Sequence, residues 1–186
     1  MKNFTQMMAG IIILFLSGCA SQQPVKSPVS EIEAVETYLN RGVAYSQKGE
    51  NKRAISDYNK AIEINPEFVV AYLNRGYTYS KMGEYEKAIS DYTRAIAINP
   101  RYAIAYNNRG LVYRKMGEYD RAIFDYGKTV EINPGYALAY YNRANAYYQK
   151  GDYDRAWEDV YKAQSLGYPV SPGFFKTLGE ATGRQR

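Results

Sequence analysis

The sequence repeats every 34 residues over most of its length, and this period limits the folds that the chain can adopt. A Tyr-X-Asn-Arg tetrapeptide begins at Tyr38, Tyr72, Tyr106 and Tyr140. A fixed period of this length is typical of arrays of small supersecondary units that bury their apolar faces against one another. Such arrays present an extended surface, so the repeat predicts a binding protein.

Each copy contains two segments with helical periodicity. In the first segment Tyr38, Gly42 and Tyr45 fall at i, i+4 and i+7, and the second segment repeats this spacing from Ala54 onwards. This spacing places the three residues on one face of a helix. A glycine such as Gly49 can end the first helix in a left-handed conformation, and an Asn-Pro pair ends the second. The predicted unit is helix, turn, helix.

Seven recurring positions resemble the signature of the tetratricopeptide repeat (TPR) family. In the first copy they are Gly42, Tyr45, Gly49, Ala54, Tyr58, Ala61 and Pro66. The resemblance implies an all-α, right-handed superhelical α-solenoid. We assign an array over residues 31–170 with four units, at 35–68, 69–102, 103–136 and 137–170. The last unit departs most from the pattern, with Ala144 in place of glycine and Val160 in place of tyrosine.

Residues 171–186 are predicted to form a capping helix and a frayed tail from Ala181 onwards. Ser171 and Pro172 suit the N-cap and the first helical position, and Phe174, Phe175 and Leu178 follow on nearly one face. An array of repeats leaves its last apolar face open, and these side chains would cover it. The alternative is that the phenylalanines hold a partner.

The first residues resemble a bacterial lipoprotein signal. Residues 1–18 combine Lys2, a short apolar run and the sequence Leu16-Ser-Gly, which precedes Cys19. The apolar run is too short to span a membrane. The resemblance implies cleavage before Cys19 and lipidation of that residue, including an N-acyl chain such as palmitate. The alternative is an incidental cysteine in an ordinary signal peptide.

A lipidated Cys19 would place the protein in the bacterial cell envelope. In lipoproteins of Gram-negative bacteria an aspartate after the cysteine disfavours delivery to the outer membrane. Ala20 and Ser21 follow the cysteine here, so the resemblance implies the outer membrane, facing the periplasm. Residues 19–30 contain two prolines and read as a flexible tether. Ser30 and Glu33 have the form of a capping box, which predicts that the first helix begins near Glu31.

The charge and the aromatic content do not favour nucleic-acid binding. The net charge is +5, and basic and acidic residues alternate along the second helices rather than forming a basic patch. Most of the 21 tyrosines fall in recurring columns, and we assign these to packing within the repeats. Tyr77, Tyr141 and Tyr148 fall outside these columns, on first helices.

In TPR proteins the first helices line a concave groove that holds peptides or helices, so the resemblance implies a partner-binding groove. The candidate groove residues are Leu73, Asn74, Tyr77, Asn107, Asn108, Leu111, Arg114, Tyr141, Asn145 and Tyr148. This face is apolar and aromatic with a basic edge, which suits a peptide that carries hydrophobic anchors and an acidic group. The alternative is that these residues only pack neighbouring helices. Asn74 and Asn108 belong to a column that recurs in every unit, which also suits a structural hydrogen bond.

An arginine stands in each unit where TPR sequences usually carry leucine, and each unit has an aspartate in its second helix. A charge at a packing position needs a partner. We therefore predict structural ion pairs, within a unit or between units, among Arg41, Arg75, Arg109, Arg143, Asp57, Asp91, Asp125 and Asp159.

The sequence offers little for catalysis. It has no histidine, its single cysteine is assigned to lipid, and no phosphate-binding loop or nucleophile motif appears. We expect no enzyme activity, no cofactor and no metal. The predicted function is a membrane-anchored scaffold or adaptor that binds a protein or peptide partner in the envelope and is itself a monomer. The alternative is a self-associating structural repeat protein.

Overall fold

The structure, a computed structural model, describes residues 28–183, which form nine α-helices and no strand. The helices are α1 (Pro28–Gln47), α2 (Asn51–Ile64), α3 (Val69–Lys81), α4 (Tyr85–Ile98), α5 (Ala103–Lys115), α6 (Tyr119–Ile132), α7 (Ala137–Lys150), α8 (Tyr153–Ser165) and α9 (Pro172–Thr182). No helix in this range is both long and apolar enough to cross a membrane. The predicted signal peptide, Cys19 and the tether up to residue 27 lie outside the described residues.

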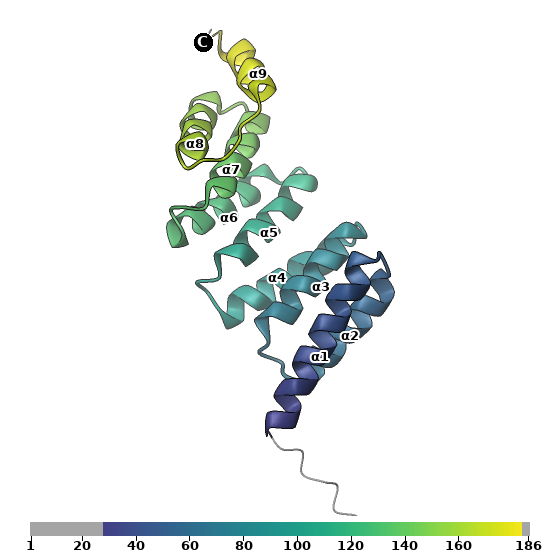
Figure 1. Ribbon diagram of the computed structural model, residues 1–186. Coiled ribbons are helices and arrows are strands. Elements are labelled where there is room, and N and C mark those ends of the chain that lie inside the picture. Colours follow the sequence, from purple (N-terminus) through teal and green to yellow (C-terminus); the bar gives the residue numbers. More distant parts are fainter. Residues whose placement is uncertain (1–27, 184–186) are drawn as a thin grey trace, which may run out of the picture.

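The helices form an elongated array in which each helix packs on the next (Figure 1). The odd-numbered helices also contact one another along the array, α1 with α3, α3 with α5 and α5 with α7, whereas no comparable contact joins consecutive even-numbered helices in the described range. Helices on the inner side of a curved array lie closer together than those on the outer side. The helices α1, α3, α5 and α7 therefore line the concave side of an α-solenoid.

The turns follow from the residues that the sequence places there. Gly83 and Gly117 adopt φ of 78° after α3 and α5, a left-handed conformation that costs glycine little. After α2 the side-chain oxygen of Asn65 accepts a hydrogen bond of 3.0 Å from the backbone N–H of Glu67, and the asparagines after α4 and α6 do the same. These Asx turns redirect the chain into the next unit.

Close packing within the first three units depends on a glycine in the first helix. A Cβ atom added to Gly42 would lie 2.6 Å from the ring of Tyr58 in the second helix. The fourth unit has Ala144 instead, and Val160 replaces the tyrosine that would otherwise lie against it. The two departures from the repeat are therefore one coupled change, because the smaller valine leaves room for the methyl group.

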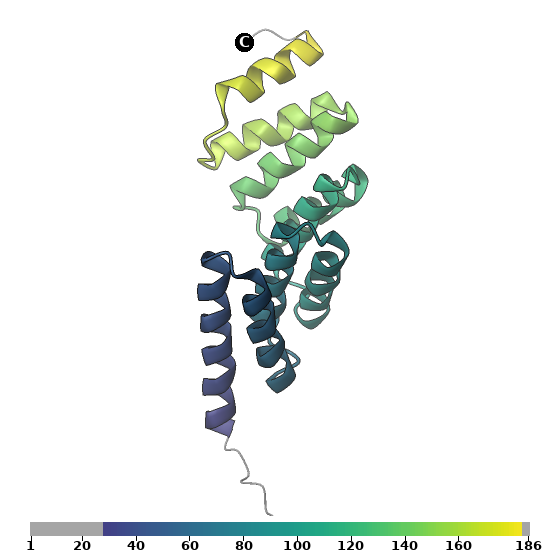
Figure 2. The ribbon, with the colours of Figure 1, turned by 90° about the vertical axis from the view of Figure 1, so that its right-hand side faces the viewer.

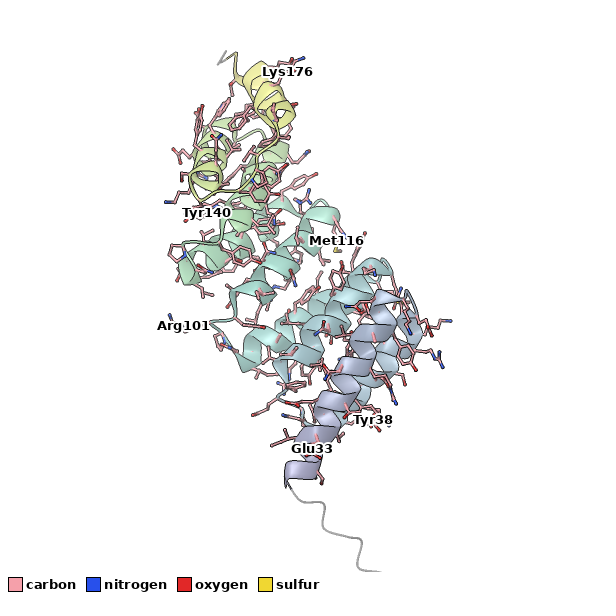
Figure 3. The ribbon with its side chains drawn as sticks, viewed as in Figure 1. Glu33, Tyr38, Arg101, Met116, Tyr140 and Lys176 are labelled. Carbon is pink, nitrogen blue, oxygen red and sulfur yellow. The ribbon has the colours of Figure 1, made fainter. Side chains whose placement is uncertain are left out.

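The two ends of the array differ. At the C-terminal end, Phe175 and Leu178 of α9 pack on Trp157 and Val160 of α8, so α9 covers the last unit. The Ser171 side chain caps α9, as the sequence predicts, and Lys176 projects from its outer face (Figure 3). The helix continues to Thr182, so the prediction of a frayed tail from Ala181 is wrong by two residues.

At the N-terminal end, α1 extends beyond its partner α2 (Figure 2). The helix begins at Pro28, so Ser30 lies inside the helix and not at its N-cap, and the predicted start near Glu31 is three residues too late. Proline suits this place because the first helical residues need no N–H donor. Ile32, near this end, is 61% exposed.

Candidate functional site

The concave side of the solenoid carries large apolar side chains that are open to solvent. Tyr77 on α3 is 53% exposed, Ile104 on α5 is 40% exposed and Leu138 on α7 is 37% exposed. Ile104 and Leu111 lie seven residues apart and so share a face of α5. Exposed apolar side chains that follow one another along consecutive helices form a surface for a partner.

Two candidate groove residues are buried and cannot contact a partner on this surface. Asn107 is 2% exposed and Leu73 is 8% exposed. The Asn107 side-chain oxygen accepts a hydrogen bond of 3.1 Å from Asn142 on the next first helix. Leu73 lies four positions before the exposed Tyr77, and Asn107 lies four positions before the half-buried Leu111. Both lie on the face that packs against the following unit. For these two, the alternative of helix packing is correct.

Tyr141 and Tyr148 lie next to the C-terminal segment of the same chain. The ring of Tyr141 stacks on Tyr168 at a centroid distance of 4.7 Å and meets the edge of Phe174 at 5.5 Å. Tyr148 contacts Phe174 at 6.0 Å and Tyr153 at 5.7 Å. The cap thus occupies the C-terminal end of the groove, and a partner has Tyr77, Leu111 and their neighbours available.

The asparagine column does not form a continuous ladder. The Asn74 amide donates to the carbonyl of Val70 on its own helix at 2.8 Å, and the Asn108 side-chain oxygen accepts from Asn107 at 3.3 Å. Asn145, one of the non-recurring candidates, likewise donates to the carbonyl of Tyr141 at 2.8 Å. Asn74, Asn108 and Asn145 remain partly exposed, so each can offer further hydrogen bonds to a partner.

The C-terminal ends of the first helices supply a basic edge. Lys81 lies over the ring of Tyr77 at 5.8 Å, and Lys115 lies over Tyr85 at 5.9 Å. Arg114 lies one turn after Leu111 on α5. The opposite edge, at the helix starts, carries Ile104 and Leu138. The surface is therefore apolar along one edge and basic along the other.

The four arginines of the repeat form two-point salt bridges with the aspartates 16 residues further on. The pairs are Arg41–Asp57, Arg75–Asp91, Arg109–Asp125 and Arg143–Asp159, with N···O distances between 2.7 and 2.9 Å. Each pair joins the first and second helices of one unit. The aspartates are at most 5% exposed.

The arginines also reach the preceding unit. Arg75 donates to the side-chain oxygen of Asn59 at 2.5 Å and Arg109 donates to the hydroxyl of Thr93 at 3.0 Å. The corresponding residue before Arg143 is Gly127, which has no side chain. Burial raises the pKa of Asp125, and the hydrogen bonds from Arg109 oppose this shift. The ion pairs are thus structural links between the two helices of each unit, and Arg75 and Arg109 also join the second helix of the preceding unit.

The described residues were also compared with the requirements of a metal site and of a cavity. Residues 28–183 contain no group of His, Cys, Asp and Glu side chains that could hold a metal ion.

A cavity of about 430 Å³ is lined by the paired Arg109 and Asp125, by Tyr113 and by Phe124, which is 60% exposed on α6. Phe124 is not among the predicted groove residues, although it breaks a column that holds Ser56 and Ser90 in earlier units.

Paired helices, a glycine-tyrosine contact in each of the first three units and a concave face of first helices define an α-solenoid of the kind that mediates protein interactions. Family models described as tetratricopeptide repeat match residues 69–102, 103–136 and 126–158, and a model described as TPR repeat matches residues 42–83. The chain belongs to the tetratricopeptide repeat family.

Several solved structures resemble the chain. One titled as the crystal structure of MamA is 39% identical, with a TM-score of 0.67, over 71% of this chain and 77% of that one. The first TPR of Spaghetti (RPAP3) bound to the HSP90 peptide SRMEEVD is 25% identical, with a TM-score of 0.59, over 61% of this chain and 90% of that one. The comparison with curated proteins gave no match.

Proposed function

We propose that the protein is a lipid-anchored scaffold that binds a protein or peptide partner in its concave groove. The observation that carries the proposal is the row of exposed apolar side chains on consecutive first helices, Tyr77, Ile104 and Leu138. Binding of a partner over this row would remove apolar surface from water, which favours the complex. The TPR of Spaghetti, which shares the fold, is bound to a peptide in its solved structure.

The membrane attachment rests on the sequence alone. The lipobox-like residues that end at Cys19 support lipidation, and several buried acyl chains would hold the protein stably on a membrane. The proposed location is the bacterial outer membrane, facing the periplasm. Replacement of Cys19 with serine should move the protein from the membrane fraction to the soluble fraction and abolish palmitate labelling. Retention of the label in Cys19→Ser would reject the anchor.

The groove is tested by crosslinking and pull-down from membranes. The variant combines Tyr77→Ser, Ile104→Ser and Leu138→Ser, which remove the exposed apolar row without touching a buried residue. The matched control is Phe124→Ser, an exposed apolar side chain on the second helix of the third unit. We expect the partner to be lost with the groove variant and kept with the control. If both variants recover the same proteins as the wild type, the groove is not the recognition surface.

A second candidate is self-association through the N-terminal end. A cavity of about 270 Å³ there is lined by Ile32, Val35, Ile64 and Phe68 among others, and no preceding unit covers it within residues 28–183. The cap formed by α9 argues against end-to-end stacking at the other end. Light-scattering mass measurements on residues 28–183, with and without residues 171–183, separate the two candidates. A mass that stays monomeric in both forms excludes self-association.

A further inference from the structure

The N-terminal end of the array is an open apolar surface in the part of the chain from residue 28 to residue 183. The apolar lining of the cavity of about 270 Å³ at this end consists of Ile32, Val35, Ile64 and Phe68. A second cavity, of about 420 Å³, adjoins the first, because Glu31 and Ile64 line both. At the opposite end α9 covers the last unit (Figure 1). Arrays of repeats need a cover at both ends, so the N-terminal end calls for one as well.

The rim of this open end is acidic. Glu31 and Glu36 line the smaller cavity, and Glu63 lines the larger one. Glu63 pairs with Lys60, whereas Glu31 and Glu36 form no ion pair within residues 28–183. A group that suits this end therefore combines an apolar side chain with an adjacent positive charge.

The chain carries such a combination directly before α1. Lys26 is the only charged residue between Cys19 and Pro28, and Val25 precedes it. From Pro28 to Ile32 the helix rises by about 6 Å, and the three residues from Val25 to Pro28 can span up to about 10 Å. Both side chains can therefore reach the open end of the array.

The start of α9 shows how a similar segment of this chain packs. Residues 169–172 read Pro-Val-Ser-Pro, and residues 24–28 read Pro-Val-Lys-Ser-Pro. Before α9 the Ser171 side chain caps the helix, and Val170 packs against the buried cluster that contains Phe175. An apolar residue just ahead of a helix often packs back on the first turn in this way.

We infer that residues 24–26 fold back on the N-terminal end of their own array, with Val25 in the cavity of about 270 Å³ and Lys26 beside Glu31. A valine side chain fits, because a cavity of about 150 Å³ already holds a molecule of the size of benzene. The segment thus covers the first unit, as α9 covers the last.

The attachment of the segment favours it over other occupants. A group joined to its site by a short linker has an effective concentration in the millimolar range, so a second copy of the chain at micromolar concentration must bind far more tightly to displace it. A membrane surface suits this end less well, because anionic lipids repel the carboxylates of Glu31, Glu36 and Glu63.

The docked segment also fixes how the array is held, a consequence that rests on the proposed lipid anchor. With Val25 in the cavity, only the residues from Cys19 to Val25 link the array to the lipid, and they span at most about 20 Å. The first unit would then face the membrane, and the groove would extend away from it.

Nuclear magnetic resonance of methyl-labelled residues 20–186 tests the docking. This form lacks Cys19, so its result does not depend on lipidation, and rejection of the anchor by Cys19→Ser would leave it unaffected. We expect nuclear Overhauser contacts between the methyl groups of Val25 and those of Ile32 or Ile64. The absence of such contacts would overturn the inference. Contacts that form only between differently labelled molecules in a mixed sample would also overturn it, because they would identify a second copy as the occupant.

Thermal unfolding of the same form measures what the valine contributes. Val25→Ser should lower the melting temperature by about 2 °C, because part of a buried valine is lost, and should bring it to the value of residues 28–186. Gln22→Ser is the matched control in the same segment and should have no effect. An unchanged melting temperature in Val25→Ser would contradict burial of this side chain.

A double-mutant cycle tests the charge. Lys26→Gln and Glu31→Gln should each move the methyl resonance of Ile32 towards its position in residues 28–186, and the double variant should move it little further. Lys52→Gln removes a positive charge from an exposed position on α2 and should leave the resonance in place. Additive effects of the first two changes, or an equal effect of Lys52→Gln, would overturn the pairing of Lys26 with Glu31.

Discussion

Asp57 and Asp91 occupy the same position in successive units, yet their arginine partners lie in different surroundings. The side chain of Arg75 is 19% exposed, whereas that of Arg41, in the first unit of the described array, is 53% exposed. Asp91→Ala leaves a largely buried arginine without its carboxylate and should lower the free energy of unfolding by about 3 to 5 kcal/mol. Asp57→Ala should lower the free energy of unfolding by less, because water can replace the lost carboxylate beside the exposed Arg41.

Urea unfolding of residues 28–183, followed by circular dichroism, measures this difference. Ser90→Ala serves as a control because Ser90 is exposed and adjacent to Asp91. Equal losses for Asp57→Ala and Asp91→Ala would contradict the role assigned to burial.

Gly127 offers a place where the protein can be stabilised. It lies inside α6 without a left-handed conformation, and an added Cβ would meet only Arg143 Nη1, at 3.8 Å. Gly127→Ala should raise the free energy of unfolding by about 0.5 to 1 kcal/mol, the usual cost of glycine within a helix. Gly127→Thr should gain at least as much despite its lower helix propensity, because the hydroxyl can accept from Arg143 as Thr93 accepts from Arg109. A threonine variant less stable than the alanine variant would argue against that hydrogen bond.

The buried tyrosines of the first and third units provide a matched pair. Tyr58→Phe removes a hydroxyl that has partners and should lower the free energy of unfolding by about 1 kcal/mol. Tyr126→Phe removes a hydroxyl that has no hydrogen bond of good geometry and whose polar neighbour is the single side chain of Arg114, so it should lower the free energy of unfolding by less than Tyr58→Phe does. Thermal unfolding of both variants decides the point, and a loss in Tyr126→Phe as large as in Tyr58→Phe would indicate a hidden partner.

At the scale of the helices, α9 is the element whose removal is easiest to observe. The only tryptophan of the chain, Trp157, packs against Phe175 and donates from Nε1 to the Thr182 hydroxyl at 3.3 Å. Deletion of residues 171–186 should therefore lower the melting temperature and shift the tryptophan emission to longer wavelength, because water reaches the indole. Deletion of residues 184–186 alone should change neither. An unshifted emission spectrum after the longer deletion would show that α9 does not cover α8 in solution.

The helices themselves were predictable from the sequence because their limits are local. Gly83 and Asn99 each end a helix by a conformational preference of one or two residues. The contacts of Asn107 and Leu73 were not predictable in the same way. Their burial depends on the rotation between units, and periodicity does not distinguish two neighbouring faces of a helix that both meet other copies. The groove prediction failed at these two residues for that reason.

At the scale of the whole molecule, stability should be highest in the middle units, because these are flanked on both sides. The first turns of α1 extend beyond α2 and have few neighbours, whereas Val112 and Tyr126 in the third unit are almost fully buried. Hydrogen exchange followed by mass spectrometry should show fast exchange for residues 31–34 and the slowest exchange within α5 and α6. Uniform protection along the chain would indicate that the array unfolds only as a single block.

The polar contacts between units give the chain a way to keep its order. Nearly identical helix pairs risk docking on the wrong neighbour during folding, a known failure of repeat proteins. Here each junction has its own pair: Ser46 with Thr78, Thr93 with Arg109, and Asn107 with Asn142. A unit that packed against one that is not its neighbour in the sequence would bury at least one of these groups opposite an apolar residue. The pairs thus specify which unit packs against which, although the units are otherwise nearly identical in sequence.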